Sequence, residues 1–189
     1  MLKKSILTLI TLFSLLLFSG CFNDDANDML SSKEHVLTTL GGKQIVIKQD
    51  GEDFFLSSQK DKLVIFDIFA TWCPPCQASA THLSSLQKKY KEDILIIGVT
   101  IEKPERTNEG ALVNDKLNKF RLKYNARYTM VNSEENSKLS NAIVKALEMG
   151  ERYPIPILTM YKNGKYINHY VGAVQEEFVE SDIKRALNK

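Results

Sequence analysis

Residues 62–76 read KLVIFDIFATWCPPC, and this stretch decides the fold that we expect. Residues 62–70 form a continuous apolar run of strand length, which is typical of a strand buried on both faces in a mixed or parallel sheet. Two cysteines spaced Cys-x-x-Cys follow at once. Pro74 and Pro75 between them suit the first turn of a helix, where backbone N–H groups lack partners. The stretch therefore predicts a strand that leads into a cysteine pair at the start of a helix.

The flanking sequence predicts one α/β domain. The helix should run to about Tyr90, and residues 93–100 form a second buried strand, which favours a parallel pair with a right-handed crossover. Residues 35–48 predict a β-hairpin with a glycine turn. We therefore expect a mixed central sheet flanked by helices. The other expected elements are helices at 112–124, 137–149 and 175–187, strands at 127–132, 157–161 and 166–171, and an Asn-Gly turn at 162–165.

Composition excludes several other classes of protein. The chain has 189 residues, of which 43% are hydrophobic and 25% charged, and this mix indicates a globular domain rather than a disordered, collagen-like or coiled-coil chain. Lys and Arg number 25 against 23 Asp and Glu, for a net charge of +2. There is no basic excess that would indicate nucleic-acid binding, so we expect no nucleic-acid partner.

The first 20 residues have the pattern of an export signal. Lys3 and Lys4 precede an apolar run at 5–18 that is short for a bilayer span. The sequence Phe18-Ser19-Gly20-Cys21 resembles a bacterial lipoprotein processing box, with Phe18 where such boxes usually carry Leu. It implies lipidation of Cys21, whereas the alternative is an uncleaved membrane anchor. Either reading places the rest of the chain outside the cytoplasm, on the periplasmic side or the cell surface.

The expected division of the chain follows from this reading. Residues 1–20 are the signal peptide, and residues 21–34 are the lipidated cysteine followed by a polar, acidic tether without periodicity. Residues 35–189 are the folded domain, with an inserted α/β unit at about 105–150. The lipid on Cys21 would hold this domain at a membrane.

The two cysteines of the motif point to redox chemistry. With Cys21 lipidated, Cys73 and Cys76 alone remain, and one pair is no disulfide framework. A helix N-terminus favours a thiolate, so Cys73 should have a lowered pKa and act as the nucleophile. Cys76, one turn further in, should be more buried and resolve the mixed disulfide.

A metal site fits the sequence less well. Zinc normally takes four ligands, and the only histidines, His35, His82 and His169, are scattered along the chain. We therefore expect no metal and no cofactor other than the redox-active disulfide Cys73–Cys76.

Asp67 stands inside the apolar run, between Phe66 and Ile68. A buried carboxylate is costly unless it is protonated or paired, and burial raises its pKa toward neutrality. We expect Asp67 to accept the proton of Cys76, through a water molecule, when the mixed disulfide is resolved. The alternative is an aspartate on an edge strand that faces solvent.

The motif also resembles a known family. Residues 70–76 (ATWCPPC) closely resemble the active-site motif of the TlpA/ResA family of exported, thioredoxin-like thiol–disulfide oxidoreductases. Asp67 precedes Cys73 by six positions, as the buried acid of thioredoxin does. Residues 156–164 (PILTMYKNG) resemble the cis-proline loop of thioredoxin and its following strand. The resemblance extends over residues 35–187 and implies a thioredoxin-like fold.

The resemblance implies roles for further residues. Pro156 would be the cis-proline packed against the cysteines, and Ile155 would offer backbone groups to a bound peptide. Trp72 would present an aromatic face to the substrate; the alternative is a core tryptophan. The sequence departs from the family at Ser79 and Thr81, where a Glu and a Pro are common. The missing Glu leaves Asp67 as the expected acid.

The expected function is that of a monomeric, membrane-anchored thiol–disulfide oxidoreductase that acts on exported proteins. The family resemblance favours a reductase, for example of apocytochrome c, with a membrane electron donor of the CcdA/DsbD type. Cys-x-x-Cys alone does not determine the direction of electron flow. The alternatives are a copper carrier that uses Cys73 and Cys76 as soft ligands, and an inert surface lipoprotein.

Overall fold

The computed structural model describes residues 33–59 and 61–189. Its central sheet has five strands in the order β10-β9-β4-β5-β8. Strand β4 (Leu63–Phe69) lies in the middle, parallel to β5 (Ile94–Thr100) and antiparallel to β9 (Ile157–Lys162). The sheet is completed by β8 (Thr129–Val131), parallel to β5, and β10 (Lys165–Val171), antiparallel to β9. The expected mixed sheet with a parallel β-α-β core is confirmed.

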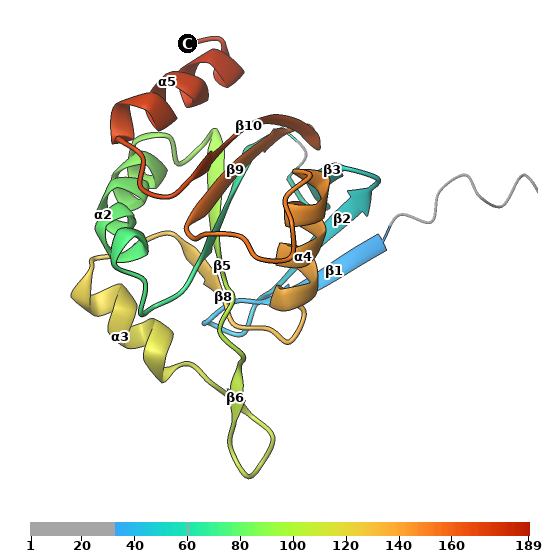
Figure 1. The fold of residues 1–189 in the computed structure, drawn as a ribbon, viewed down its shortest axis with the longest axis vertical. Coiled ribbons are helices and arrows are strands. Elements are labelled where there is room, and N and C mark those ends of the chain that lie inside the picture. Colours follow the sequence, from blue (N-terminus) through green and yellow to red (C-terminus); the bar gives the residue numbers. More distant parts are fainter. Residues whose placement is uncertain (1–32, 60) are drawn as a thin grey trace, which may run out of the picture. The chain divides into compact units, whose positions relative to one another are not determined.

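Helices and a second sheet cover the two faces of this sheet (Figure 1). Helices α2 (Pro74–Lys89), α3 (Asp115–Lys123) and α5 (Glu176–Leu187) lie on one face. Helix α4 (Asn136–Ala146) and the N-terminal strands lie on the other. We call the core under α2, α3 and α5 the disulfide layer, because it contains both cysteines, and the core under α4 the opposite layer.

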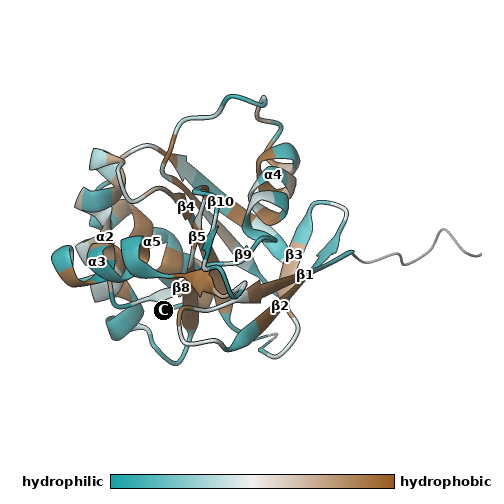
Figure 2. Ribbon diagram, turned by 90° about the horizontal axis from the view of Figure 1, so that it is seen from below, coloured by the Kyte–Doolittle hydropathy of each residue, from teal (hydrophilic) through white to brown (hydrophobic). Residues whose placement is uncertain are grey.

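Strand β4 supplies side chains to both layers. Leu63, Ile65 and Phe69 pack in the disulfide layer, and Val64, Phe66 and Ile68 pack in the opposite layer. Because side chains alternate along a strand, burial on both faces requires a continuous apolar run. Figure 2 shows the apolar colour concentrated on the strands, while the helices turn hydrophilic surfaces outward.

The N-terminal hairpin is confirmed and is larger than expected. It begins at Lys33, two residues before the expected start of the domain, and forms a three-stranded antiparallel sheet of β1 (Lys33–Thr38), β2 (Gln44–Asp50) and β3 (Asp53–Leu56). Strand β3 was not predicted. The expected signal peptide at 1–20, lipidated Cys21 and most of the tether lie outside the described residues.

The inserted unit differs from the prediction at the start of its first helix. We expected a helix at 112–124, but Leu112–Val113 forms strand β7, paired with β6 (Glu105–Arg106), and α3 begins only at Asp115. Gly110 has a φ of +83° in the turn between the two strands, a conformation that suits glycine. In the described part of the chain, every helix is too short or too polar to cross a membrane.

Candidate active site

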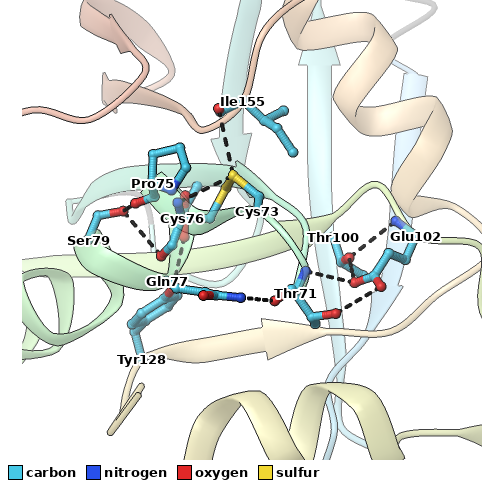
Figure 3. The surroundings of a disulfide bond; sticks show 11 residues. Thr71, Cys73, Pro75, Cys76, Gln77, Ser79, Thr100, Glu102, Tyr128 and Ile155 are labelled. Atoms are coloured by element: carbon cyan, nitrogen blue, oxygen red, sulfur yellow. Dashed lines mark hydrogen bonds between the residues drawn. A yellow bond between two sulfur atoms is a disulfide. The ribbon is translucent and has the colours of Figure 1, made fainter. Parts of the chain in front are cut away.

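The two cysteines lie at the N-terminus of α2 and form a disulfide (Figure 3). Cys73 is the N-cap residue, and its Sγ accepts a hydrogen bond of 3.3 Å from the backbone N–H of Cys76. Pro74 and Pro75 occupy the first two helical positions, as expected. The sulfur of Cys73 therefore sits at the positive end of the helix, where a thiolate is favoured over a thiol.

Burial does not distinguish the two cysteines, contrary to our expectation. Cys73 is 3% exposed and Cys76 is 2% exposed. Their difference comes instead from position, because Cys73 caps the helix and Cys76 lies within its first turn. Only the cap sulfur receives the N–H of its partner, so a negative charge is better stabilised on Cys73 than on Cys76.

Residues from two segments lie next to the disulfide. The Ile155–Pro156 peptide bond is cis, and the carbonyl oxygen of Ile155 lies 3.7 Å from Sγ of Cys73. Trp72 precedes the cysteines and is 65% exposed, which excludes a core tryptophan. The expected substrate-binding residues Trp72, Ile155 and Pro156 thus lie next to the cysteine pair in sequence or in space.

The loop before the cysteines is held from two sides, and sequence analysis missed one of its partners. Glu102 accepts hydrogen bonds from the backbone N–H and the hydroxyl of Thr71, both at 2.9 Å. Gln77, on α2, donates a hydrogen bond of 2.8 Å to the carbonyl of Thr71. Figure 3 shows both contacts. Because Thr71 and Glu102 are 31 positions apart, no local motif could have revealed this pair.

Asp67 is buried in the disulfide layer, because it alternates with the apolar residues of β4 that face α2. The residue is 2% exposed, and the strand has neighbours on both sides, so an edge-strand aspartate facing solvent is excluded. Its Oδ2 accepts a hydrogen bond of 2.8 Å from the hydroxyl of Tyr128. Burial raises the pKa of Asp67 from 3.8 to about 7, and the hydrogen bond from Tyr128 opposes the rise.

A small cavity adjoins Asp67. Its volume is about 20 Å³, and its lining includes Ser79 and His82 of α2, Pro156 and Glu176. A cavity of this size has room for one water molecule. The His82 side chain is half exposed, and its Nδ1 lies 3.0 Å from a carboxylate oxygen of Glu176. The cavity therefore extends from the buried acid toward polar groups at the surface.

The described residues also bear on metal binding. Within residues 33–59 and 61–189, no three His, Cys, Asp or Glu side chains are grouped so that they could hold a metal ion. The disulfide is suited to thiol–disulfide exchange, and the buried acid with its adjoining cavity is suited to holding and moving a proton.

Comparisons with known proteins agree with this geometry. Residues 37–158 match the model of the AhpC/TSA family. The chain is 26% identical over 172 residues to the thiol–disulfide oxidoreductase ResA of Bacillus thuringiensis, covering 89% of this chain and 85% of that protein. It is 27% identical over 93 residues to thioredoxin-1 of Drosophila melanogaster, covering 49% of this chain and 87% of that protein.

Solved structures share the fold. A thiol:disulfide interchange protein of the thioredoxin family from Chlorobium tepidum superposes with a TM-score of 0.58 at 18% identity, covering 82% of this chain and 94% of that one. A secreted Mycobacterium tuberculosis disulfide oxidoreductase homologous to DsbE gives 0.53 at 18% identity, covering 79% and 94%. The expected thioredoxin-like fold is confirmed.

Proposed function

The chain belongs to the AhpC/TSA family and is a ResA-like thiol–disulfide oxidoreductase of thioredoxin fold, and from this premise we propose that it is anchored outside the cytoplasm and reduces disulfides of exported proteins. The observation that carries the proposal is the Cys73–Cys76 disulfide at the N-terminus of α2, with a buried acid, Asp67, on the strand β4 that leads into it. The anchor would be a lipid on Cys21, which follows the apolar leader.

The proposed reaction starts from the reduced protein. The Cys73 thiolate attacks one sulfur of the substrate disulfide, the substrate S–S bond breaks, and the other substrate sulfur leaves as a thiolate that takes a proton from solvent. Cys76 then loses its proton to Asp67 and attacks Sγ of Cys73. The mixed disulfide breaks, the second substrate sulfur leaves as a thiolate that takes a proton from solvent, and the Cys73–Cys76 disulfide forms. Two electrons have passed to the substrate, and a membrane donor dithiol of the CcdA/DsbD type would return them.

Substrate binding would use the exposed residues around the disulfide. The carbonyl of Ile155 lies beside Cys73, so an extended peptide could pair with the backbone next to Pro156 in the manner of an added strand. Trp72 offers exposed aromatic surface beside it. Apocytochrome c before haem attachment is one substrate of the required kind, an exported chain whose cysteine pair must be reduced from a disulfide to thiols.

The donors around Cys73 support the reductase direction. A strong oxidant owes its potential to a stabilised reduced form. Here Pro74 and Pro75 occupy the first two helical positions, and neither has an N–H to donate to a thiolate. The N–H of Cys76 is the contact made to Sγ of Cys73 from within this first turn. We therefore expect a reduction potential nearer that of thioredoxin, about −270 mV, than that of DsbA, about −120 mV.

Trapping of mixed disulfides tests the proposal. In Cys76→Ser, attack by Cys73 proceeds but resolution cannot, so exported proteins should accumulate as disulfide-linked adducts on non-reducing gels. The matched variant Cys73→Ser should trap few. Redox titration of the wild-type protein would measure the potential, and copper titration of the reduced protein would test the carrier alternative. Equal trapping by both variants, or a potential near that of DsbA, would contradict the proposed roles or direction.

A further inference from the structure

Tyr128 is a buried residue that the proposed reaction does not yet use. It is 3% exposed, and its hydroxyl donates a hydrogen bond of 2.8 Å to Oδ2 of Asp67. The two residues are 61 positions apart. Tyr128 directly precedes β8, and strand β5 separates β8 from β4 in the sheet. The tyrosine side chain therefore reaches across a whole strand to contact the acid.

Gly98 makes this reach possible. It lies on β5 directly opposite Asp67 in the parallel register. A Cβ atom at Gly98 would lie 3.0 Å from the Tyr128 ring, 3.1 Å from the Phe69 ring and 3.3 Å from Cγ of Met130. Any larger side chain would occupy the space that the tyrosine ring needs. The sequence thus leaves a gap beside the acid, and Tyr128 fills it.

The hydrogen bond makes the two oxygens of Asp67 different. Oδ2 accepts from Tyr128, whereas the buried Oδ1 has no hydrogen-bond partner among residues 33–59 and 61–189. Asp67 also lines the cavity of about 20 Å³. We propose that Tyr128 is a positioning residue, which holds Oδ2 so that Oδ1 remains the atom that takes the proton of Cys76. This inference rests on the proposed function, because it assigns a helper to the proposed base.

The surroundings of Asp67 make Tyr128 the dominant polar influence on it. Burial raises the pKa of Tyr128 well above 10, and the charge of Asp67 and the hydrogen bond to it add to the rise, so the hydroxyl stays a donor. The other titratable groups that line the cavity are His82 of α2 and Glu176 of α5, which pair with each other. Strand β9 contributes apolar Leu158, and β5 contributes Gly98 opposite the acid.

Tyr128→Phe removes the hydroxyl and keeps the ring. The carboxyl titration of Asp67 should be followed by carbon-13 NMR in the oxidised protein, with Asp67→Asn to assign the signal. Resolution by Cys76 should be followed by stopped flow across pH 5–9. The Tyr128 hydroxyl donates a hydrogen bond to the Asp67 carboxylate, so its loss should raise the pKa of Asp67. The pH profile of resolution should then move to higher pH, and resolution at neutral pH should be about tenfold slower. Attack by Cys73 should be unchanged.

Three further substitutions separate positioning from packing. Tyr161→Phe removes another buried tyrosine hydroxyl, but in the opposite layer, and it should leave both profiles unchanged. Gly98→Ala keeps the Tyr128 hydroxyl but crowds its ring, so it should move the titration in the same direction as Tyr128→Phe. Gly150→Ala, where no atom lies within 4 Å of a new Cβ, should move nothing.

The outcomes distinguish this inference from the function on which it rests. If Tyr128→Phe leaves the Asp67 titration and the resolution profile in place while Asp67→Asn slows resolution, the positioning role is overturned and the base remains. If Asp67→Asn does not slow resolution, both the base and its positioning are overturned. Adduct trapping by Cys76→Ser reports on the oxidoreductase itself and does not depend on either result.

Discussion

Strand β4 lies between the two core layers, and neighbouring residues of this strand meet different surroundings in them. Phe66 enters the opposite layer, where its ring makes edge contacts with Phe54 and Tyr161 at centroid distances of 6.5 and 5.9 Å. Asp67, the next residue, enters the disulfide layer and meets Tyr128 and a cavity. Dense aromatic packing stabilises a fold, whereas a buried acid lowers its stability when ionised. Both layers pack against the sheet, where the disulfide layer has its own ring contact between Phe69 and Phe120, but only the disulfide layer contains the residues of the proposed reaction.

The largest effect on stability should come from Phe66→Ala. Deleting a fully buried ring from a packed core costs about 3–5 kcal/mol of unfolding free energy, and no ionisable group of the proposed reaction contacts this ring. The loss, measured by urea unfolding, should be nearly constant between pH 5 and 8. Attack and resolution rates of the folded protein should match the wild type. A changed pH profile of resolution would show that the two layers are not separate in function.

Asp67→Asn should stabilise the protein, and the gain should depend on pH. The carboxyl titrates near 3.8 in the unfolded chain and near 7 in the folded one, so between these values the folded protein holds the additional proton. Stability therefore falls as pH rises from about 4 to 7, by up to about 4 kcal/mol, and the asparagine variant escapes this loss. Urea unfolding at pH 5 and pH 8 would measure it. Resolution should slow by about 10²-fold.

Asp182→Asn is the matched control for the pH dependence. Asp182 is also buried. Burial alone would raise the pKa of Asp182, but hydrogen bonds from Tyr170 and Asn168 and the charge of Arg185 hold this pKa below its ordinary value. Its stabilising contribution is present above the unfolded pKa and is lost in acid. The substitution should therefore destabilise the protein at pH 7, opposite in sign to Asp67→Asn. Equal signs would contradict the contrast between the two acids.

The smallest of these effects should come from Glu102→Gln, at the rim of the disulfide layer. The carboxylate accepts from both the N–H and the hydroxyl of Thr71, and the amide keeps one of the two acceptor oxygens. We expect a loss of about 1–2 kcal/mol in unfolding free energy and a modestly slower attack by Cys73. An unchanged attack rate in stopped flow would show that the loop is held sufficiently by Gln77.

Much of the fold follows from local patterns. The apolar run of β4 and the two prolines after Cys73 predict a strand and a helix start, and both are confirmed. Strand β3 was missed because it has only four residues, with charged or polar residues on both sides. The start of α3 was placed too early, since Leu112 and Val113 continue the apolar spacing of the helix but pair with β6 instead.

Local patterns likewise predict only some of the residues of the candidate site. Spacing predicts the cysteine pair, and the apolar neighbours of Asp67 predict its burial and raised pKa. Tyr128, Glu102 and Gly98 could not be found from sequence, because each matters only through a partner on another strand or loop. A tyrosine or glycine in an ordinary strand pattern carries no local sign of such a contact.

The two edge strands of the central sheet, β8 and β10, differ in how readily they could pair with a further strand. The outer side of β8 is occupied by residues 38–40, through hydrogen bonds that join Thr38 to Asn132 and Leu40 to Met130, and a bridge from Thr39 to Val131. Strand β10 pairs with β9 alone in the described sheet. Open edges invite further strands, and a break in register between Tyr166 and Asn168 hinders such growth. Substitutions that straighten β10 would therefore favour self-association along this edge, far in sequence from the cysteines.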